Sequence, residues 1–141
     1  MNQNERVIVF ASSDDPLFSS DLVDELKSLG FEVRFCTNSM EVLEQFEPST
    51  GVIPHLLITD SFLQHGSEFD AHETRAGTNT GNALYEKLRE SHPKLPVIIH
   101  TSSRAMHSAF GMINDPFFCT VYDSALDDDR QIIAAAKKFL N

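Results

Sequence analysis

The sequence predicts an α/β protein in which a five-stranded parallel sheet carries helices on both faces, a doubly wound fold. Three observations lead to this fold class. Segments with the apolar pattern of a strand alternate five times with segments of helical periodicity. Leu56–Ile58 and Val97–Ile99 are continuous apolar runs, which are typical of parallel strands buried on both faces. Acidic or hydroxyl residues follow several strand segments, at the edge where open sheets of this class bind ligands.

Each element follows from a local pattern of side chains. Asn38 with Glu41 three residues later has the form of a capping box, and Gly30 suits the end of the preceding helix. The expected strands are Arg6 to Ala11, Phe31 to Cys36, a run ending at Asp60, Leu95 to His100 and Phe117 to Tyr122. The expected helices are Leu17 to Leu29, a short one after Asn38, Asn82 to Ser91, one containing Met106, Phe110 and Ile113, and one from the acids at 127–129 to Leu140.

The expected strand order is 2-1-3-4-5, because the second strand alternates apolar with charged residues like an edge strand and precedes a buried third strand. The segment from Gln64 to Thr80 interrupts the pattern as a polar insert, with no apolar periodicity beyond Phe69. A loop of this length in a compact domain is either functional or mobile. Its acids and histidines fit a solvated loop better than a transition-metal site; they are His65, Glu68, Asp70, His72 and Glu73.

Length and composition restrict the classes of function. The 141 residues suffice for one domain with its own core, which we expect to span residues 1–141. A net charge of −10 with 11 basic residues and no basic cluster argues against nucleic acid as a partner. No apolar run could span a bilayer and no signal peptide is recognisable, so we expect a cytoplasmic protein without membrane contact. Cys36 and Cys119 lack metal-ligand spacing and are expected to be buried, reduced thiols.

Carboxylates are expected to converge at the ends of the first and third strands, which are neighbours in this order. Asp14 and Asp15 follow the first strand, and Asp60 ends the third. Such a cluster of oxygen ligands suits Mg²⁺ or Mn²⁺ rather than zinc. With a metal present, Asp60 can act as a nucleophile toward phosphorus while Thr101 donates a hydrogen bond to a phosphoryl oxygen. The alternatives without chemistry are helix N-terminal charge for the acidic pair and helix capping by Thr101 or Ser102.

The sequence resembles the receiver domain of bacterial two-component response regulators, which has a CheY-like (flavodoxin-like) fold. The resemblance extends over nearly the whole chain and rests on Ser13-Asp14-Asp15-Pro16, Leu56-Leu57-Ile58-Thr59-Asp60 and Pro96-Val97-Ile98-Ile99-His100-Thr101-Ser102. It implies that Asp60 accepts a phosphoryl group from a histidine kinase or a phosphotransfer protein. It also implies that Asp14, Asp60 and the backbone carbonyl of Phe62 bind Mg²⁺, and that Thr101 is the hydroxyl that reads the phosphoryl group.

Tyr122, on the fifth strand, is the candidate switch aromatic in this interpretation. Our hypothesis is that phosphorylation repositions Thr101 and Tyr122 and so changes the surface of the last two helices for a downstream protein partner. A phosphoprotein of this kind is a signalling domain rather than an enzyme with turnover. We expect a monomer or a weak dimer.

The sequence departs from the pattern of the receiver family at three places. Ser13 stands where the first acid of the usual pair is found, so Asp15 would have to supply the second carboxylate. No Lys occurs between Lys94 and Lys137, so the family's lysine after the fifth strand is absent. This loss removes a cation that would compensate phosphoryl charge, and Arg104 is the candidate replacement. The usual proline shortly after the acceptor aspartate is also missing.

Three functions therefore stay open from the sequence. The first is a stand-alone receiver domain in phosphorelay signal transduction, with Asp60 as phosphoacceptor. The second is a pseudo-receiver, a protein-interaction module that works without phosphorylation. The third is a flavodoxin-like cofactor binder, which would need a Gly-containing phosphate loop after the first strand. The segment Ala11–Pro16 has no Gly there and carries two acids that would repel a phosphate.

Overall fold

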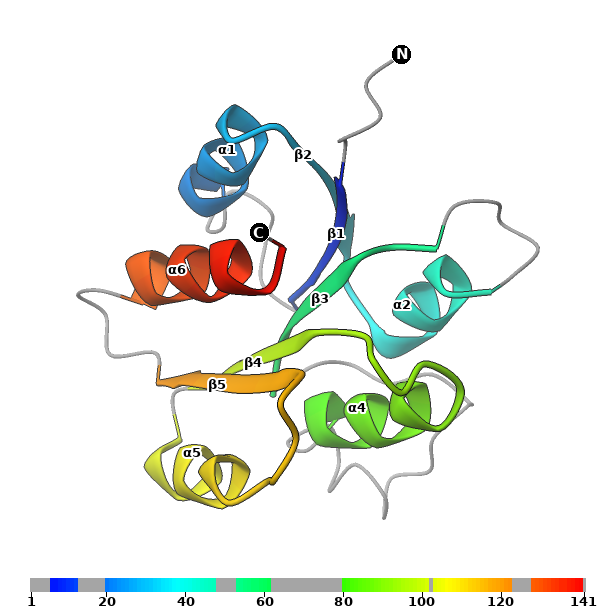
Figure 1. The fold of residues 1–141 in the computed structure, drawn as a ribbon, viewed down its shortest axis with the longest axis vertical. Helices are drawn as coiled ribbons and strands as arrows, with labels where there is room; N and C mark the ends of the chain where they lie inside the picture. The colour runs from blue at the N-terminus through cyan, green and yellow to red at the C-terminus, as the bar shows by residue number, and fades with distance from the viewer. Residues whose placement is uncertain are drawn as a thin grey trace.

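The protein is built on one parallel sheet of five strands in the order β2-β1-β3-β4-β5, as the sequence predicts (Figure 1). The computed structural model describes residues 6–12, 20–47, 53–61, 80–101, 103–122 and 128–140. The strands are β1 (Arg6–Ala11), β2 (Phe31–Cys36), β3 (Leu56–Asp60), β4 (Val97–Thr101) and β5 (Phe118–Tyr122). Every neighbouring pair is parallel.

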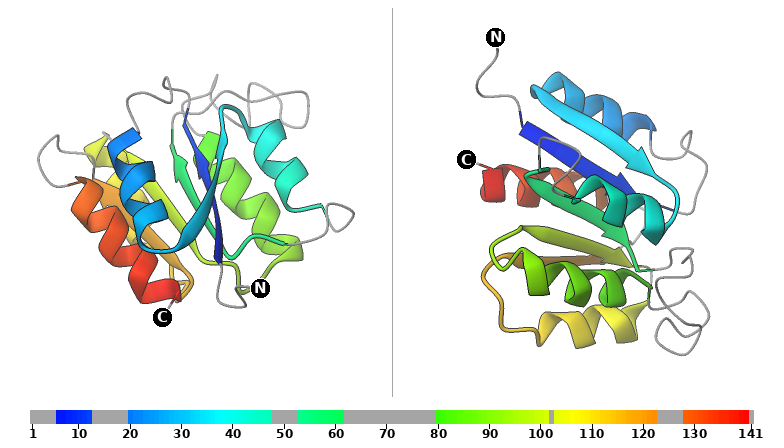
Figure 2. Two further views of the ribbon diagram at one scale, coloured as in Figure 1. Left: turned by 90° about the horizontal axis from the view of Figure 1, so that it is seen from above. Right: turned by 90° about the vertical axis from the view of Figure 1, so that its right-hand side faces the viewer.

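Helices cover both faces of the sheet, which confirms the doubly wound architecture (Figures 1 and 2). Those within the described ranges are α1 (Ser20–Ser28), α2 (Ser39–Gln45), α4 (Thr80–Ser91), α5 (Arg104–Gly111) and α6 (Asp128–Leu140). One apolar core joins α1 and α6 to the sheet, and a second joins α2, α4 and α5 to the opposite face. Two cores on one sheet require central strands that are apolar on both sides.

Burial along the strands follows this layered arrangement. The first four residues of β3 are all buried, as are the last five of β1. Both edge strands are only half-buried: in β2 Cys36 alone is buried, and in β5 only Val121. The alternation of β2 therefore reports its edge position, as predicted from the sequence.

The predicted helix signals at both ends of β2 are confirmed. Gly30, which follows α1, has a φ of +96°, a backbone conformation that favours glycine. Asn38 accepts a hydrogen bond on Oδ1 from the Glu41 N–H at 2.9 Å, so it is the N-cap of α2. The return bond goes one residue beyond the cap, because Glu41 accepts from the Thr37 N–H at 2.7 Å rather than from the Asn38 N–H of a standard capping box.

The boundaries near the insert and β4 differ from the expectation. The helix expected from Asn82 begins at Thr80, which is buried, so the polar insert ends before that residue. The strand expected over Leu95–His100 lies at Val97–Thr101, because the Leu95 N–H donates to the His92 carbonyl in a turn and Pro96 has no N–H. Most of the insert and Leu17–Ser19, where the first helix was expected to begin, lie outside the described residues.

The thiols agree with the expectation in part. Both cysteines are free, and Cys36 is buried while Cys119 is half-buried. Burial, together with the negative charges of Glu41 and Glu44, raises the pKa of Cys36 to about 12. This thiol is therefore protonated and unreactive at neutral pH.

One polar cluster joins α4 to the segment that precedes β5. Asp115 accepts hydrogen bonds from the Tyr85 hydroxyl and, at 2.9 Å, from Nε of Arg89. Its other oxygen accepts from the Phe117 N–H at 2.9 Å. The side chains of Arg89 and Asp115 are only 18% and 13% exposed, so the ion pair is largely shielded from water. The cluster holds the carboxyl-terminal half of α4 against the start of β5.

Asp115 should make the free energy of unfolding depend on pH in the acidic range. Burial alone would raise the pKa of its carboxyl, but the hydrogen bonds from Tyr85 and Phe117 and the charge of Arg89 hold it below the usual 3.8. Because the pKa of the Asp115 carboxyl is lower in the folded than in the unfolded state, this group stabilises the fold at any pH above its unfolded-state pKa. The stabilisation is lost as the pH falls through its folded-state pKa.

We expect Asp115→Asn to reduce the free energy of unfolding at pH 7 by about 1–2 kcal/mol, because Arg89 loses a charged partner. Below about pH 4 the difference between wild type and variant should shrink as the wild-type carboxyl is protonated. Urea denaturation from pH 3 to pH 7 measures this, with Glu90→Gln on the exposed side of α4 as control. A difference that is constant across this range would contradict the role of the Asp115 charge.

Candidate functional site

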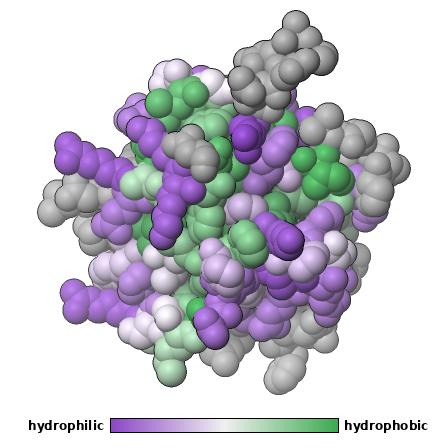
Figure 3. Space-filling model, viewed as in Figure 1, coloured by the Kyte–Doolittle hydropathy of each residue, from purple (hydrophilic) through white to green (hydrophobic). Residues whose placement is uncertain are grey.

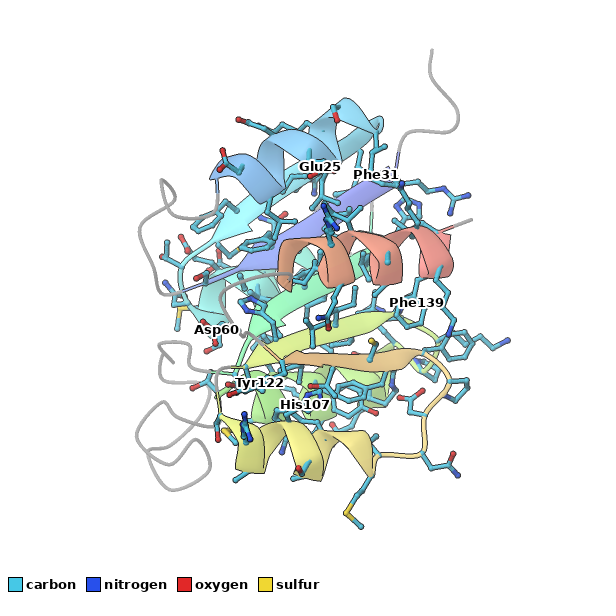
Figure 4. All side chains as sticks on the ribbon, turned by 90° about the vertical axis from the view of Figure 1, so that its left-hand side faces the viewer. Glu25, Phe31, Asp60, His107, Tyr122 and Phe139 are labelled. Atoms are coloured by element: carbon cyan, nitrogen blue, oxygen red, sulfur yellow. The ribbon has the colours of Figure 1, made fainter. Side chains whose placement is uncertain are left out.

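The candidate site lies at the carboxyl edge of the sheet, where β1 and β3 end side by side. Ala11 and Thr59 are partners across the two strands, which brings the end of β1 next to Asp60. Asp60 is the last residue of β3 and is partly exposed, whereas the four preceding residues are buried. The strand thus ends its apolar run with one carboxylate at the surface. Figure 4 shows Asp60 and Tyr122 at this same end of the sheet, with Phe139 at the opposite end.

The hydroxyl of Thr101 is fixed by two hydrogen bonds that it accepts. Ser61, which directly follows Asp60, donates from Oγ to Thr101 Oγ1 at 2.8 Å, and both side chains are buried. The Ser103 N–H donates to the same oxygen at 3.1 Å. A hydroxyl has two acceptor lone pairs and one donor, so Thr101 keeps its O–H for a further acceptor. This is the hydrogen-bonding capacity that a hydroxyl needs in order to bind a phosphoryl oxygen.

Ser61 ties β3 to β4 a second time through its backbone. The Ser61 N–H donates to the carbonyl of His100 at 3.0 Å, and Asp60 and His100 are partners in the register of the two strands. The His100 ring packs against Phe10, with a distance of 6.0 Å between ring centroids. His100 is therefore part of the aromatic packing of the sheet, although it is only half-buried.

The first turn of α4 contacts the backbone at the end of β3. The Gly81 N–H donates to the Ser61 carbonyl at 3.2 Å. A Cβ added at Gly81 would lie 2.7 Å from the carbonyl oxygen of Asp60 and 2.9 Å from Cα of Ser61. These atoms belong to the backbone and cannot rotate away. The position therefore requires glycine for close approach rather than for an unusual φ angle.

Sequence reasoning missed Ser61, Thr80 and Gly81 as parts of the site. The sequence pattern places Thr80 in the polar insert and assigns no role to Ser61. The available signal was the pair Thr80–Gly81 directly before a helical pattern, since glycine inside the first turn of a helix indicates close packing there.

Ser103, rather than Thr101, is the N-cap of α5. Its Oγ accepts from the Met106 N–H at 3.3 Å, and its backbone is extended. The alternative in which Thr101 caps this helix is therefore wrong, and Ser102 lies outside the described residues. Because the Ser103 N–H is bonded to Thr101 Oγ1, the cap of α5 is linked directly to the candidate switch hydroxyl.

Tyr122, the candidate switch aromatic, is the partner of Thr101 across β4 and β5. It is half-buried, and the guanidinium carbon of Arg104 lies 5.6 Å from the centre of its ring. Nε of Arg104 donates to the Tyr122 hydroxyl at 3.4 Å. The His107 ring lies 5.8 Å away from the Tyr122 ring (Figure 4). Two side chains of α5 thus contact the aromatic ring that neighbours Thr101.

The predicted metal ligands cannot all be located. Asp14, Asp15 and the Phe62 carbonyl lie outside the described residues, as do the histidines of the insert and Asp123–Ala125 after β5. In the part of the chain that the structure describes, no group of three or more His, Cys, Asp or Glu side chains is arranged to bind a metal. Asp60 is the one predicted ligand whose place is established.

Comparison with known proteins gives a consistent result at the level of structure. No protein-family model matches the sequence, and no curated protein matches it. The structure is similar to a CheY-like response regulator receiver domain protein from Methanospirillum hungatei, with a TM-score of 0.69, 16% identity and coverage of 96% of this chain and 93% of that one. The chain has the fold of a receiver domain.

Two further solved structures agree. The non-phosphorylated HemR receiver domain from Leptospira biflexa has a TM-score of 0.68 at 12% identity, with coverage of 96% of this chain and 94% of that one. A response regulator receiver protein from Sinorhizobium medicae has a TM-score of 0.64 at 18% identity, with coverage of 97% and 95%. The receiver fold thus accounts for nearly the whole chain. Within the described ranges, none of its helices is long and apolar enough to cross a membrane.

Gly81 offers a test of how closely α4 approaches Asp60 in this receiver fold. We expect Gly81→Ala to lower the free energy of unfolding by about 1–3 kcal/mol, because the new methyl group meets backbone that must move. Gly111 on α5 is the matched control, since a Cβ there meets nothing within 4 Å and alanine favours the helix. Chemical denaturation of the two variants measures the difference. Equal stability of the two would contradict the close approach.

Proposed function

We propose that this protein is a receiver domain that accepts a phosphoryl group on Asp60 and transmits this event to a protein partner. The observation that carries the proposal is that Asp60 ends β3 at the same edge of the sheet where Thr101 ends the neighbouring strand β4, one residue beyond His100, the partner of Asp60. A carboxylate ends the central strand β3, and next to it, on β4, stands a hydroxyl that accepts two hydrogen bonds and keeps its own O–H. The receiver fold of the chain supports this interpretation.

The chemistry proposed for Asp60 is phosphoryl transfer. One carboxylate oxygen attacks phosphorus of a phosphohistidine on a histidine kinase or phosphotransfer protein. The bond between phosphorus and oxygen forms as the phosphorus–nitrogen bond breaks, which returns the imidazole. The Thr101 O–H then donates to a phosphoryl oxygen, while Ser61 and Ser103 keep Thr101 Oγ1 in place.

The proposal includes Mg²⁺ as the bound ion, because the predicted ligands are all oxygen atoms. Asp14, Asp60 and the Phe62 carbonyl all offer oxygen, the ligand type that Mg²⁺ prefers, and Asp15 is the reserve carboxylate in place of Ser13. When bound, Mg²⁺ would neutralise part of the charge on the transferring group. Asp60 is partly exposed at the open edge of the sheet, so its carboxylate is accessible to an ion from solvent.

Arg104 is proposed as the cation that replaces the missing lysine. Arg104 is exposed at the start of α5, and its guanidinium lies against the ring of Tyr122. Tyr122 is on β5, where it is the partner of Thr101 on β4. The five N–H donors and permanent charge of Arg104 suit a phosphoryl oxygen.

A second candidate function follows from the same departures in sequence. The absence of a lysine between Lys94 and Lys137 and of a first acid at Ser13 favours a pseudo-receiver. In that case the domain binds its partner without phosphorylation. The two functions differ in one observable, a phosphoryl group on Asp60.

We expect a mass increase of about 80 Da, one phosphoryl group, after incubation with Mg²⁺ and acetyl phosphate. Peptide mapping should place it on Asp60, and Asp60→Asn should show no adduct. Intact-mass spectrometry on freshly treated protein measures both. Asp24→Asn on the exposed surface of α1 is the matched control and should be modified like wild type. No adduct at any donor concentration would contradict the phosphoacceptor and favour the pseudo-receiver.

A further inference from the structure

A groove separates α4 from α5 on one face of the sheet. The two helices lie side by side there (Figures 1 and 2), and the groove holds about 390 Å³. The α4 wall is polar and is formed by Asn82 and Glu86. The α5 wall presents Ala105 and Ala109, both exposed. Larger apolar side chains on or after α5 close the inner side and pack on the core; they are Met106, Phe110 and Ile113.

Both walls of this α4–α5 groove are hydrogen-bonded to the candidate site at their amino-terminal ends. Gly81, in the first turn of α4, donates to the carbonyl of Ser61. Ser103, the cap of α5, donates to Thr101 Oγ1, and this oxygen also accepts from Ser61 Oγ. Displacement of Ser61 or Thr101 would therefore strain hydrogen bonds that hold one or both walls. This gives a physical connection between Asp60 and the width of the groove.

The two walls differ in how firmly they are held. At its carboxyl-terminal end α4 is fixed by Arg89, which donates to Asp115 and to the carbonyls of His92 and Phe117. The helix also packs against α2. By contrast, α5 has eight residues, and only Phe110 is buried. Helices this short have little stability of their own, so α5 depends on its packing against β4 and β5 and on its cap.

The surface chemistry of the groove fits an amphipathic helix with basic residues. Alanine at two positions four residues apart lets a partner helix approach α5 closely, since side-chain size sets the distance between helix axes. Glu86 is exposed, and its carboxylate accepts a hydrogen bond from a neutral amide, Nδ2 of Asn82, at 3.4 Å. Neither of the two ion pairs found between described residues, Glu32–Arg34 and Arg89–Asp115, involves Glu86, so its carboxylate can receive a cation. The net charge of −10 also attracts a basic partner.

We propose that the α4–α5 groove binds a basic amphipathic helix of a partner protein. The apolar stripe of the partner helix covers Ala105 and Ala109, and a Lys or Arg of the helix pairs with Glu86. The response of the groove to phosphorylation rests on the function proposed for Asp60. Binding to the unmodified protein does not rest on it.

Binding to the unmodified protein is tested with two synthetic peptides of one length and one leucine stripe. One carries lysine on its polar face and the other carries glutamate. Fluorescence anisotropy should detect the lysine peptide alone, and its amide NMR shifts should map to α4 and α5. Glu86→Lys and Ala109→Gln, which fills the groove, should each weaken binding about tenfold. Circular dichroism and thermal unfolding confirm that each variant is folded.

The matched control for Glu86→Lys is Glu44→Lys on α2, which makes the same change of net charge on an exposed residue outside the groove. It should weaken binding less than about twofold, as expected from screened long-range charge alone. Equal weakening by the two charge reversals, or equal binding of the lysine and glutamate peptides, would overturn the proposal. Unchanged binding by Ala109→Gln would overturn it as well.

The coupling between phosphorylation of Asp60 and peptide binding in the α4–α5 groove is tested by repeating the titration after treatment with Mg²⁺ and acetyl phosphate. The adduct on Asp60 is measured in the same sample. We expect the affinity for the lysine peptide to change at least about threefold, within the usual range of coupling between two sites. An adduct without a change in affinity would refute the coupling and leave the phosphoacceptor intact. Absence of any adduct would refute the role of Asp60 as phosphoacceptor. The titration of the unmodified protein would still decide whether the α4–α5 groove binds the lysine peptide.

Discussion

The close contact between α4 and the end of β3 is the constraint on which the rest of the site depends. Gly81 brings helix backbone so near the Asp60 carbonyl that even a methyl group would not fit. Through this contact Ser61 is enclosed, and its carbonyl and hydroxyl are directed to α4 and to Thr101. One residue next to the candidate phosphoacceptor therefore connects a central strand, its neighbour and the start of a helix.

The architecture separates a rigid part from a part that can respond. Central strands buried on both faces resist displacement, because each side of the sheet packs on a complete apolar core. Arg89 and Asp115 fix the far end of α4 to the segment before β5. The short helix α5 depends on its cap and on Tyr122, where Arg104 and His107 contact the ring. Thr101 is linked directly to α5, because the cap residue Ser103 donates to Thr101 Oγ1.

On the part of the surface that the structure describes, large exposed apolar side chains stand singly, apart from the apolar side chains that line the α4–α5 groove. On the face shown in Figure 3, hydrophilic and hydrophobic side chains are interspersed. Among the described residues, the large apolar side chains with high exposure are Leu29, Met40 and Met112, and Met112, directly after α5, is 86% exposed. Isolated exposed apolar side chains are ordinary on a soluble surface. The α4–α5 groove differs from them because its apolar side chains are contiguous with the core.

Much of the fold could be predicted because it depends on local patterns. The bounds of β1 and β2, the end of β3 at Asp60 and the Asn38 cap all follow from short-range signals in the sequence. Thr80 is misassigned from the sequence because its burial depends on the tertiary fold, and its polar neighbours show no apolar period. The pairing of Arg89 with Asp115, across 26 residues, and the link from Ser61 to Thr101, across 40, have no local signature. The predicted magnesium ligands Asp14, Asp15 and Phe62 lie outside the described residues and stay predictions.

We propose that the chemical state of Asp60 reaches α4 and α5 through Ser61 and Thr101. The most direct measurement follows the amide signals of Gly81 and Ser103 by ¹H–¹⁵N NMR before and after treatment with Mg²⁺ and acetyl phosphate, because these two N–H groups donate to Ser61 and Thr101. We predict that both signals shift in wild type and that neither shifts in Asp60→Asn. A phosphoryl group on Asp60 that leaves both signals in place would contradict the account.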